Sequence, residues 1–489
     1  MKKVLLAVAL VILALVALVL LRGLTIGSRQ LSGLEPAVAL DFDADAAAFR
    51  LGEALRFATI SNQDRAAVDS AAFAALHEHM RQSFPRVHEA LQVDVVNDWS
   101  LLYTWPGSDA SAAPVAILGH LDVVPVEPDT ESDWTYPPFS GTVNDEWVWG
   151  RGALDVKSMV YAALESVEAL LAAGHRPRRT VLLAFGHDEE VGGWNGGAAL
   201  AELMADRKLR PLLVLDEGAA VTEGIITSVS APVSIVGLGE KGYLSVELVA
   251  RSEGGHSSMP PAETAVGILA KAIVALETNP MPARLEGPVL DMLESLAGDM
   301  DQPMRTLIAN LWLTRPLVLS QLQESNASNA TIRTTTAPTM LEGSVKENVL
   351  ATQARAVVNF RIHPNDSVDA VLDHLRTTIA DDRVEMRSDG QPSWEASPLT
   401  PMDGPAYGLV ERTIRQVLPD SLVAPTLVVG ATDARHYTGV SDGVLRFIPV
   451  RLGSEDLSRI HGLDERISRE CYSEAIRFYA QLLRNADEL

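Results

Sequence analysis

The chain has 489 residues, 47% of them hydrophobic and 21% charged, which is typical of a globular protein too long for one ordinary core and predicts two domains. Its 64 acidic residues outnumber 40 lysines and arginines, and the resulting net charge of −24 argues against nucleic acid as a partner. A single cysteine, Cys471, excludes an internal disulfide and a thiolate metal site.

The N-terminus predicts one transmembrane helix. After Lys2 and Lys3, an uninterrupted apolar run extends over residues 4–21, and a helix of that length spans roughly 27 Å, close to the thickness of a bilayer core. Only Arg22 and Arg29 follow nearby, a bias that favours an uncleaved anchor with the rest of the chain outside the cytoplasm. The alternative is a secreted protein whose signal peptide is removed, although no A-x-A-like cleavage site follows the run.

The soluble part begins with alternating strands and helices. Residues 1–44 form the predicted anchor and tether, and a helical pattern over 43–58 follows. Apolar runs then predict strands buried on both faces, with helices between them. Strand, helix, strand is typical of an α/β fold with a mainly parallel sheet flanked by helices. The predicted strands are 115–118, 181–185 and 212–215, and the helices are 156–174 and 195–208.

A different pattern begins near residue 239. Strands that alternate with period two and amphipathic helices predict a small antiparallel sheet with two helices, an inserted α+β ferredoxin-like domain over 239–390. This domain divides the first one into parts 45–238 and 391–489. The segment 280–335 is rich in Pro, Met and Leu, and its lack of periodicity predicts no fold. The strands are 243–252, 354–363 and 384–388, and the helices are 264–277 and 367–380.

Metal-capable side chains follow each of the three buried strands. His120 and Asp122 end the first, Glu189 and Glu190 the second, and Asp216 the third. Because the carboxyl ends of parallel strands open on one crevice, we expect these side chains to converge. Several carboxylates in one crevice would raise each other's pKa values unless a cation neutralised them. A metal centre explains their number best.

Asp155 and His461 each precede a predicted helix, and each alone could be a helix cap or a loop histidine. With the strand-end residues, however, they complete two metal sites. Nitrogen and carboxylate ligands without thiolate suit two Zn²⁺ ions, with Co²⁺ or Mn²⁺ as substitutes. We assign Asp155 as the bridge between the ions. The other ligands are His120 and Asp216 on one ion and Glu190 and His461 on the second.

Two further residues have predicted roles beside the metals. Adjacent residues on an extended stretch point in opposite directions, so Glu190 can bind metal while Glu189 acts as the general base that takes a proton from water. Asp122 lies two residues beyond His120 and could orient that imidazole. A simple turn residue explains Asp122 about as well.

Five motifs occur in a recognisable order: GHLDVVP, GRGALDVK, HDEEVGG, VLDEG and RIHGLDERI. They resemble the dinuclear zinc aminoacylase/carboxypeptidase family of metallopeptidases, in its carboxypeptidase S-like branch. That branch includes membrane-anchored Gly-Xaa carboxypeptidases and N-acyl-amino-acid hydrolase/synthases. The resemblance implies the ligands and base assigned above, Asp122 as the residue behind His120, and a smaller lid domain that interrupts the catalytic one.

The resemblance also implies residues that contact the substrate. His256 in GGHSSMPP matches a lid histidine that stabilises an oxyanion. Asn348 and Arg361 match lid positions that hold a substrate carboxylate, for which arginine offers bidentate geometry. The loop GATDARHY often reads GGTD in relatives, so Ala431 departs from the pattern, as does Val156 beside Asp155. Both departures leave the shape of the pocket open.

The expected function is metal-dependent hydrolysis of an amide bond next to an amino acid with a free carboxylate, as in a carboxypeptidase or dipeptidase. Hydrolysis or synthesis of N-fatty-acyl amino acids is the alternative, and an inactive surface binding protein is a third reading. The expected partners are a small peptide or N-acyl amino acid and, through the N-terminal helix, a membrane. A homodimer through the lid domain is left open.

Overall fold

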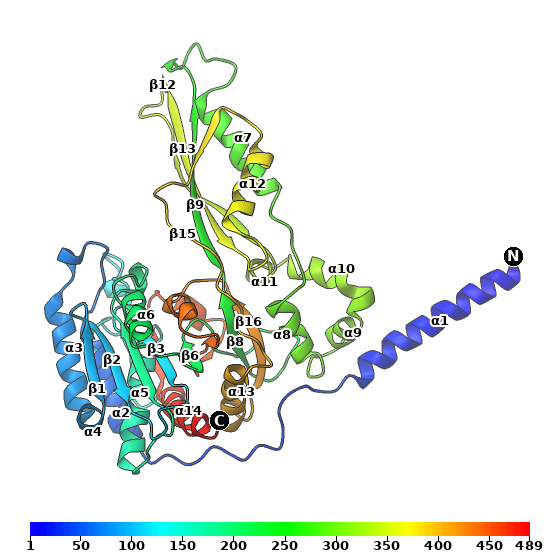
Figure 1. Cartoon of the computed structure of the whole chain (residues 1–489). Coiled ribbons are helices and arrows are strands. Elements are labelled where there is room, and N and C mark those ends of the chain that lie inside the picture. The colour runs from blue at the N-terminus through cyan, green and yellow to red at the C-terminus, as the bar shows by residue number, and fades with distance from the viewer.

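The computed structural model describes residues 1–489 and shows a larger body, a second body above it and a projecting N-terminal helix (Figure 1). The larger body contains a ten-stranded sheet. Its strands are β1 (Gln92–Val96), β2 (Ser100–Trp105), β3 (Val115–His120), β5 (Val181–Gly186), β6 (Leu213–Asp216), β7 (Val221–Thr222), β8 (Val233–Glu240), β16 (Leu422–Val428), β17 (Val444–Arg446) and β18 (Arg451–Leu452).

The order of this sheet is β1-β2-β5-β3-β6-β17-β8-β7-β18, with β16 beside β8. At its centre β3 runs parallel to β5 and β6, as the buried apolar runs predict. Towards one edge, however, β2 pairs antiparallel with β5 and with β1. Parallel pairing also joins β17 to β6, β16 to β8 and β18 to β7, whereas β8 runs antiparallel to β17 and β7. The sheet is therefore mixed, and the prediction of a mainly parallel sheet is confirmed only in part.

Helices cover both faces of the main sheet. On one face, six helices and the sheet share a core of 60 buried residues. On the other face, α6 (Gly197–Asp206) and the 3-10 helix η4 (Asp433–Gly439) cover a smaller core of 13 residues. The helices of the larger core are α2 (Ala44–Leu55), α3 (Ser70–Ser83), α4 (Pro85–Ala90), α5 (Lys157–Ala172), α13 (Pro405–Val417) and α14 (Arg469–Asp487).

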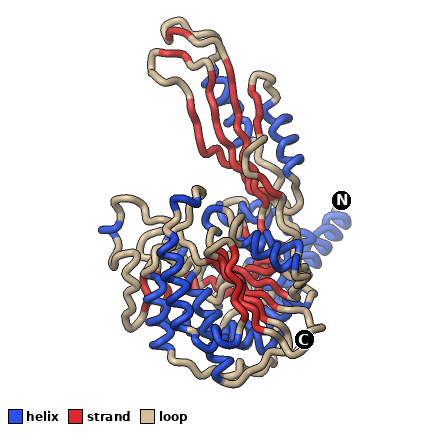
Figure 2. The backbone as a smooth tube through the Cα atoms, turned by 60° about the vertical axis from the view of Figure 1, so that its left-hand side comes forward, coloured by secondary structure: helices blue, strands red, loops and turns tan.

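The second body is an antiparallel sheet covered on one face by two helices, with its own core of 18 buried residues. Its order is β11-β13-β9-β14, with β15 beside β9. Strand β8 leads through Lys241 directly into β9, so one run of chain joins the two sheets (Figure 2). The elements are β9 (Gly242–Arg251), α7 (Ala265–Thr278), β11 (Thr335–Glu342), β13 (Gln353–Ile362), α12 (Val368–Ile379), β14 (Val384–Arg387) and β15 (Ser393–Trp394). Of these elements, β11 and the short β15 were not expected, and neither was a two-stranded pairing at the tip of this body.

The segment for which the sequence predicts no fold contains four helices: α8 (Pro288–Leu296), α9 (Met304–Ala309), α10 (Leu311–Leu322) and α11 (Asn326–Thr331). The first three of them contribute to a core of 12 buried residues that also includes Val233 of β8 and Ala424 of β16. Although this segment lies within the range expected for the inserted domain, it packs against the main sheet.

The predicted apolar run forms helix α1 (Lys2–Thr25), whose mean hydropathy reaches 3.5 and whose apolar window has no buried residue. The following residues do not hang free as a tether. Gln30 donates to Val423 O at 3.0 Å, and Val38 N donates to Gln481 Oε1 at 2.9 Å. The segment after α1 therefore lies along the larger body.

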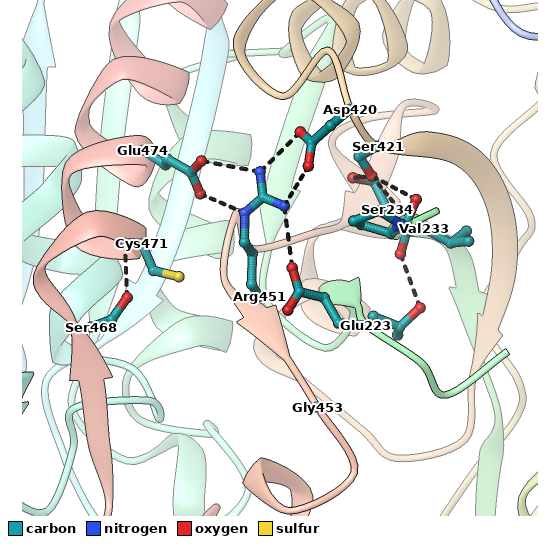
Figure 3. Close-up of polar contacts among 12 residues, drawn as sticks. Glu223, Val233, Ser234, Asp420, Ser421, Arg451, Gly453, Ser468, Cys471 and Glu474 are labelled. Carbon is teal, nitrogen blue, oxygen red and sulfur yellow. Dashed lines mark hydrogen bonds and ion pairs between the residues drawn. The ribbon is translucent and has the colours of Figure 1, made fainter. Parts of the chain in front are cut away.

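An ionic cluster joins three segments of the larger body around Arg451 (Figure 3). The guanidinium of Arg451 lies 2.8 Å from Asp420, 2.9 Å from Glu474 and 3.2 Å from Glu223. The side chain of Arg451 is only 18% exposed, so water screens these pairs less than it screens ordinary surface pairs. The cluster connects the end of β7, the loop before β16 and α14.

Candidate metal centre

Asp155, just before α5, lies between two histidines from distant parts of the chain. Its Oδ1 is 2.9 Å from His120 Nε2, and its Oδ2 is 2.9 Å from His461 Nε2. His120 ends β3, and His461 stands in a loop with a φ of 61°. One carboxylate thus directs its two oxygens at two imidazoles, which is the arrangement of a bridging ligand.

A glutamate accompanies each histidine. Glu217 Oε1 is 3.2 Å from His120 Nε2, and Glu190 Oε1 is 3.3 Å from His461 Nε2. The potential ligand atoms of His120, Asp155 and Glu190 lie within 4.8 Å of one another, as do those of His120, Glu189 and Glu217. Apart from this 3.3 Å approach of His461, the buried Glu190 Oε1 has no hydrogen-bond partner, and a cation would satisfy such an oxygen.

Asp216 belongs to neither of these two groups, so the structure gives its assignment as a ligand no support. It is the last residue of β6 and only 3% exposed, and its Oδ2 accepts a hydrogen bond from Ala434 N of η4 at 2.7 Å. Glu217 comes one residue later, beyond the end of the strand, and points to His120 instead. The motif VLDEG offers two adjacent carboxylates and contains no signal for which of them faces the crevice.

Asp122 supports the site from behind. Its carboxylate is 3.3 Å from His120 Nδ1 and is fully buried. It also accepts hydrogen bonds from the backbone of Glu189 at 3.2 Å and Glu190 at 3.1 Å. One carboxylate therefore orients an imidazole and holds the turn that carries the two glutamates.

The two glutamates separate as expected, but for a different reason. They lie in a 3-10 turn, η3 (Glu189–Val191), and not on an extended stretch. Glu190 is directed to His461, while Glu189 lies with His120 and Glu217. The turn geometry, and not strand alternation, divides them.

The electrostatics of the crevice favour a bound cation. Burial raises the pKa of Glu189 well above its usual value; the charges of Glu217 and Asp433 act in the same direction, and His120 opposes them. Burial and the neighbouring Asp155 raise the pKa of Glu217 to about 8. Carboxyl groups that repel one another in this way are neutralised by a metal ion.

Glu465, which the sequence analysis did not single out, holds the loop of Asp155. Its carboxylate accepts hydrogen bonds from Leu154 N at 2.7 Å and Asp155 N at 3.1 Å. It also pairs with Arg151 at 2.6 Å, and Arg151 donates to His461 O at 3.0 Å. This buried carboxylate thus connects the loops of Asp155 and His461. It lies inside the motif RIHGLDERI, but it follows no predicted strand, so its position in the sequence does not indicate this role.

A cavity of about 400 Å³ opens on these residues and reaches the second body. Arg361 of β13 lines it, with its guanidinium 4.8 Å from the ring centroid of Tyr243. The rings of Tyr243 and Trp394 stack with their centroids 4.7 Å apart. The guanidinium of Arg435 lies 4.8 Å from the ring centroid of Trp394. Burial lowers the pKa of Arg361, and no carboxylate hydrogen-bonds to it. A cation without an acidic partner therefore faces the metal-capable residues.

A second cavity of about 480 Å³ adjoins the first and shares Glu190, Tyr243 and Trp394 with it. Trp99 and Trp194 add aromatic surface to its wall. The largest cavity, about 670 Å³, lies between the start of α14 and the cluster around Arg451 and contains no histidine. The chemistry therefore belongs to the two smaller cavities.

His256 and Asn348 lie together but far from the metal-capable residues. His256 is in β10 (Gly255–His256), which pairs with β12 (Val349–Leu350) at the tip of the second body (Figure 1). Ser257 N donates to Asn348 O at 3.2 Å, and His256 Nδ1 accepts from Ser258 Oγ at 2.8 Å. Strand β9 has 10 residues, about 33 Å at 3.3 Å each, so its far end cannot reach Asp155 of the same chain.

The sequence matches the model of peptidase family M20/M25/M40 over residues 116–485. The chain belongs to this family. The M20 peptidases are metal-dependent, in agreement with the candidate site around Asp155. The resemblance to the carboxypeptidase S-like branch is confirmed as well.

Two relatives match most of the chain. An N-fatty-acyl-amino acid synthase/hydrolase of Xenopus tropicalis is 41% identical over 438 residues, 89% of this chain and 84% of that one. A probable carboxypeptidase S-like protein 2 of Dictyostelium discoideum is 38% identical over 443 residues, 90% of this chain and 85% of that one. The fold is similar to the M20 metallo-carboxypeptidase Sso-CP2 of Sulfolobus solfataricus, with a TM-score of 0.64 at 20% identity, covering 91% of this chain and 99% of that one.

Proposed function

We propose that this M20 protein hydrolyses the amide bond next to an amino acid with a free carboxylate, as a carboxypeptidase or dipeptidase. One observation carries the proposal. The two oxygens of Asp155 face His120 and His461, each at 2.9 Å, with an acidic residue beside either histidine. A carboxylate that directs one oxygen to each of two histidines can bridge two metal ions, as a dinuclear hydrolase site needs.

Two ions fit the donors that are present. His120, Asp155 and Glu217 would hold one Zn²⁺, and Asp155, Glu190 and His461 the second, with Co²⁺ or Mn²⁺ as substitutes. When bound, the ions supply a Lewis acid for the substrate carbonyl and lower the pKa of water towards about 7. The buried Glu190 Oε1, whose one polar neighbour is His461, and the crowded carboxyl groups support this assignment.

Glu189 is the general base of the proposed reaction. It lies beside His120 and Glu217 without being needed for either triad of ligands. Its carboxylate would take a proton from the attacking water and return it to the leaving amine. Asp122 and Glu465 act through His120 and Asp155, whose orientations they hold.

Arg361 would bind the free carboxylate of the substrate. It lines the same cavity as Asp155, it is supported by the ring of Tyr243, and it has no acidic partner of its own. Both residues belong to the second body, which we propose is a ferredoxin-like lid domain within 239–390, inserted between the catalytic parts 45–238 and 391–489. The segment 280–335 of this range packs against the main sheet instead. The order β11-β13-β9-β14 with two helices on one face supports it.

His256 and Asn348 would serve a second copy of the chain. Both are exposed at the tip of the lid, too far from Asp155 of their own chain, so a homodimer through the lid would bring them to the partner's cavity. Mixing two inactive variants, Glu189→Gln and His256→Ala, tests this. Dimers containing one of each have one complete site, so activity above that of either variant supports the dimer, and no recovery contradicts it.

The test of the main proposal is a substrate panel combined with metal removal. Blocked dipeptides with a free C-terminal carboxylate should be hydrolysed, chelation should abolish turnover, and Zn²⁺ should restore it in the wild type but not in Glu189→Gln. Metal-independent hydrolysis, or an active Glu189→Gln variant, would contradict the proposal. The second candidate is hydrolysis or synthesis of N-fatty-acyl amino acids, which the cavity walled by Trp99, Trp194 and Trp394 favours. A higher kcat/KM for N-oleoyl amino acids than for blocked dipeptides would establish it.

We also propose that α1 remains attached as a single membrane span with the catalytic part outside the cytoplasm. Its apolar composition and the two preceding lysines support this orientation. A mature N-terminus beyond residue 25, measured by mass spectrometry on the protein from its own cell, would show instead that the segment is a cleaved signal.

A further inference from the structure

We infer that α10 lies in the surface of the lipid bilayer beside α1, so that the protein contacts the membrane at two places and its catalytic body has a fixed orientation over the lipid. This inference rests on the proposed retention of α1. It assigns a role to the segment 280–335, which the catalytic proposal does not use.

The first observation is the close contact between α1 and the start of α10. The buried Asn310 donates from Nδ2 to the carbonyl of Val19 at 3.0 Å. Val19 belongs to the apolar run 4–21, so α10 begins at the depth of the last turn of the candidate span. Gly23 is the only buried residue of α1, and a Cβ there would overlap the hydroxyl of Thr306 in α9. A residue without a side chain is therefore needed at this crossing.

The second observation is the outward face of α10. Trp312 is 56% exposed, Leu313 47% and Leu317 58%, and Leu313 and Leu317 are four residues apart on one side of the helix. Pro316 is exposed beside them, so the first two turns of α10 present a group of large apolar side chains. Arg315 at the edge of this group is also exposed, but its guanidinium donates back to Leu285 O at 2.8 Å. The exposed Ser320 and Gln321 follow only in the last turn.

The surroundings of Trp312 fit a membrane interface. Trp312 lines a small cleft of about 220 Å³ together with Arg22 and Arg29, which follow the apolar run. Tryptophan and arginine at the end of a span are typical of the region of lipid headgroups.

A bilayer is the occupant that this position selects, because α10 continues the surface of a helix long and apolar enough to cross one. The net charge of −24 leaves no general attraction to anionic lipids. The contact should therefore be apolar and should not weaken when salt is added.

Site-directed labelling of the full chain in lipid nanodiscs tests the inference. The one native cysteine, Cys471, is buried, so single cysteines can be labelled selectively with an environment-sensitive fluorophore. The test positions are Leu313→Cys and Leu317→Cys on α10. Leu341→Cys on the second body is the matched water-exposed control, and Leu13→Cys in α1 reports the anchor. Turnover of a soluble dipeptide confirms that each variant is folded.

We expect labels at 313 and 317 to emit at shorter wavelength than the label at 341 and to be quenched by lipid-attached quenchers, at low and high salt alike. If the label at 13 is quenched while those at 313 and 317 match the label at 341, the anchor stands and the membrane contact of α10 is overturned. If no label is quenched, the proposed anchor fails and the inference with it. Quenching at 313 and 317 that disappears in high salt would refute the apolar contact.

Discussion

Replacing Glu217 by Gln should remove a metal ion, whereas replacing its neighbour Asp216 by Asn should not. Glu217 is one of three proposed contacts to the ion at His120, from whose Nε2 it is 3.2 Å away. Residues that only support a ligand typically change metal affinity or activity by about 10–100-fold, so loss of a ligand should exceed about 100-fold, or about 2.7 kcal/mol. Asp216 only accepts a hydrogen bond from Ala434 N, and an amide oxygen can accept the same bond. Asp216→Asn keeps this acceptor and nearly the same volume, so we expect a change in stability of about 1 kcal/mol.

The assay is metal content per chain, measured by mass spectrometry after dialysis, together with turnover across a series of Zn²⁺ concentrations. Glu217→Gln should retain less metal and regain turnover only at high Zn²⁺, while Asp216→Asn should keep its metal and stay within about tenfold of wild-type turnover. The reverse pattern, with metal lost from Asp216→Asn and kept in Glu217→Gln, would refute the placement of the two carboxylates.

Three further predictions concern other parts of the molecule. Arg361→Ala should raise KM for a substrate with a free carboxylate and leave a C-terminally amidated analogue unchanged; equal effects on both would argue against carboxylate binding. Arg451→Met should lower the free energy of unfolding by about 1–3 kcal/mol, because three carboxylates lose their cation. Metal content should stay unchanged. Denaturant unfolding measures the free energy, and an unshifted midpoint would contradict the role of the cluster. Burial lowers the pKa of Lys241, which lies between the two sheets, from the ordinary lysine value of 10.5 to about 7. Between these two pH values the unfolded chain binds a proton that the folded chain does not, so the free energy of unfolding rises with pH. The free energy of unfolding of the wild type minus that of Lys241→Met should therefore increase from pH 7 to pH 9, by up to about 1.4 kcal/mol per pH unit. Parallel pH profiles of the two proteins would contradict this.

The centre of the main sheet and much of the site follow from local patterns. The buried apolar runs became β3, β5 and β6, and the polar residues at their ends lie together because parallel strands end at one edge. His120, Asp155, Glu190 and His461 accordingly occupy one crevice. The choice between Asp216 and Glu217 could not be made, because it depends on where β6 stops, and the covering η4 that fixes this comes from a distant part of the chain.

Non-local packing limited the other predictions. The hairpin of β1 and β2 is local, with Asn97 and Asp98 at positive φ in its turn, but its attachment to the sheet through β2 and β5 joins segments far apart in the sequence. The segment 280–335 has no clear periodicity, because its helices are short and apolar on several sides, covered by the main sheet on one and adjoining α1 on another. The distance of His256 from Asp155 depends on the length and direction of β9, which the motif around the histidine does not contain.

The most direct test of the dinuclear centre is diffraction from crystals of the zinc-loaded protein at wavelengths on either side of the zinc absorption edge. Two anomalous peaks about 3.5–4 Å apart should flank the carboxylate of Asp155, one beside His120 and Glu217 and the other beside His461 and Glu190. No peak at Asp155, or a zinc ion bound by Asp216, would contradict the account.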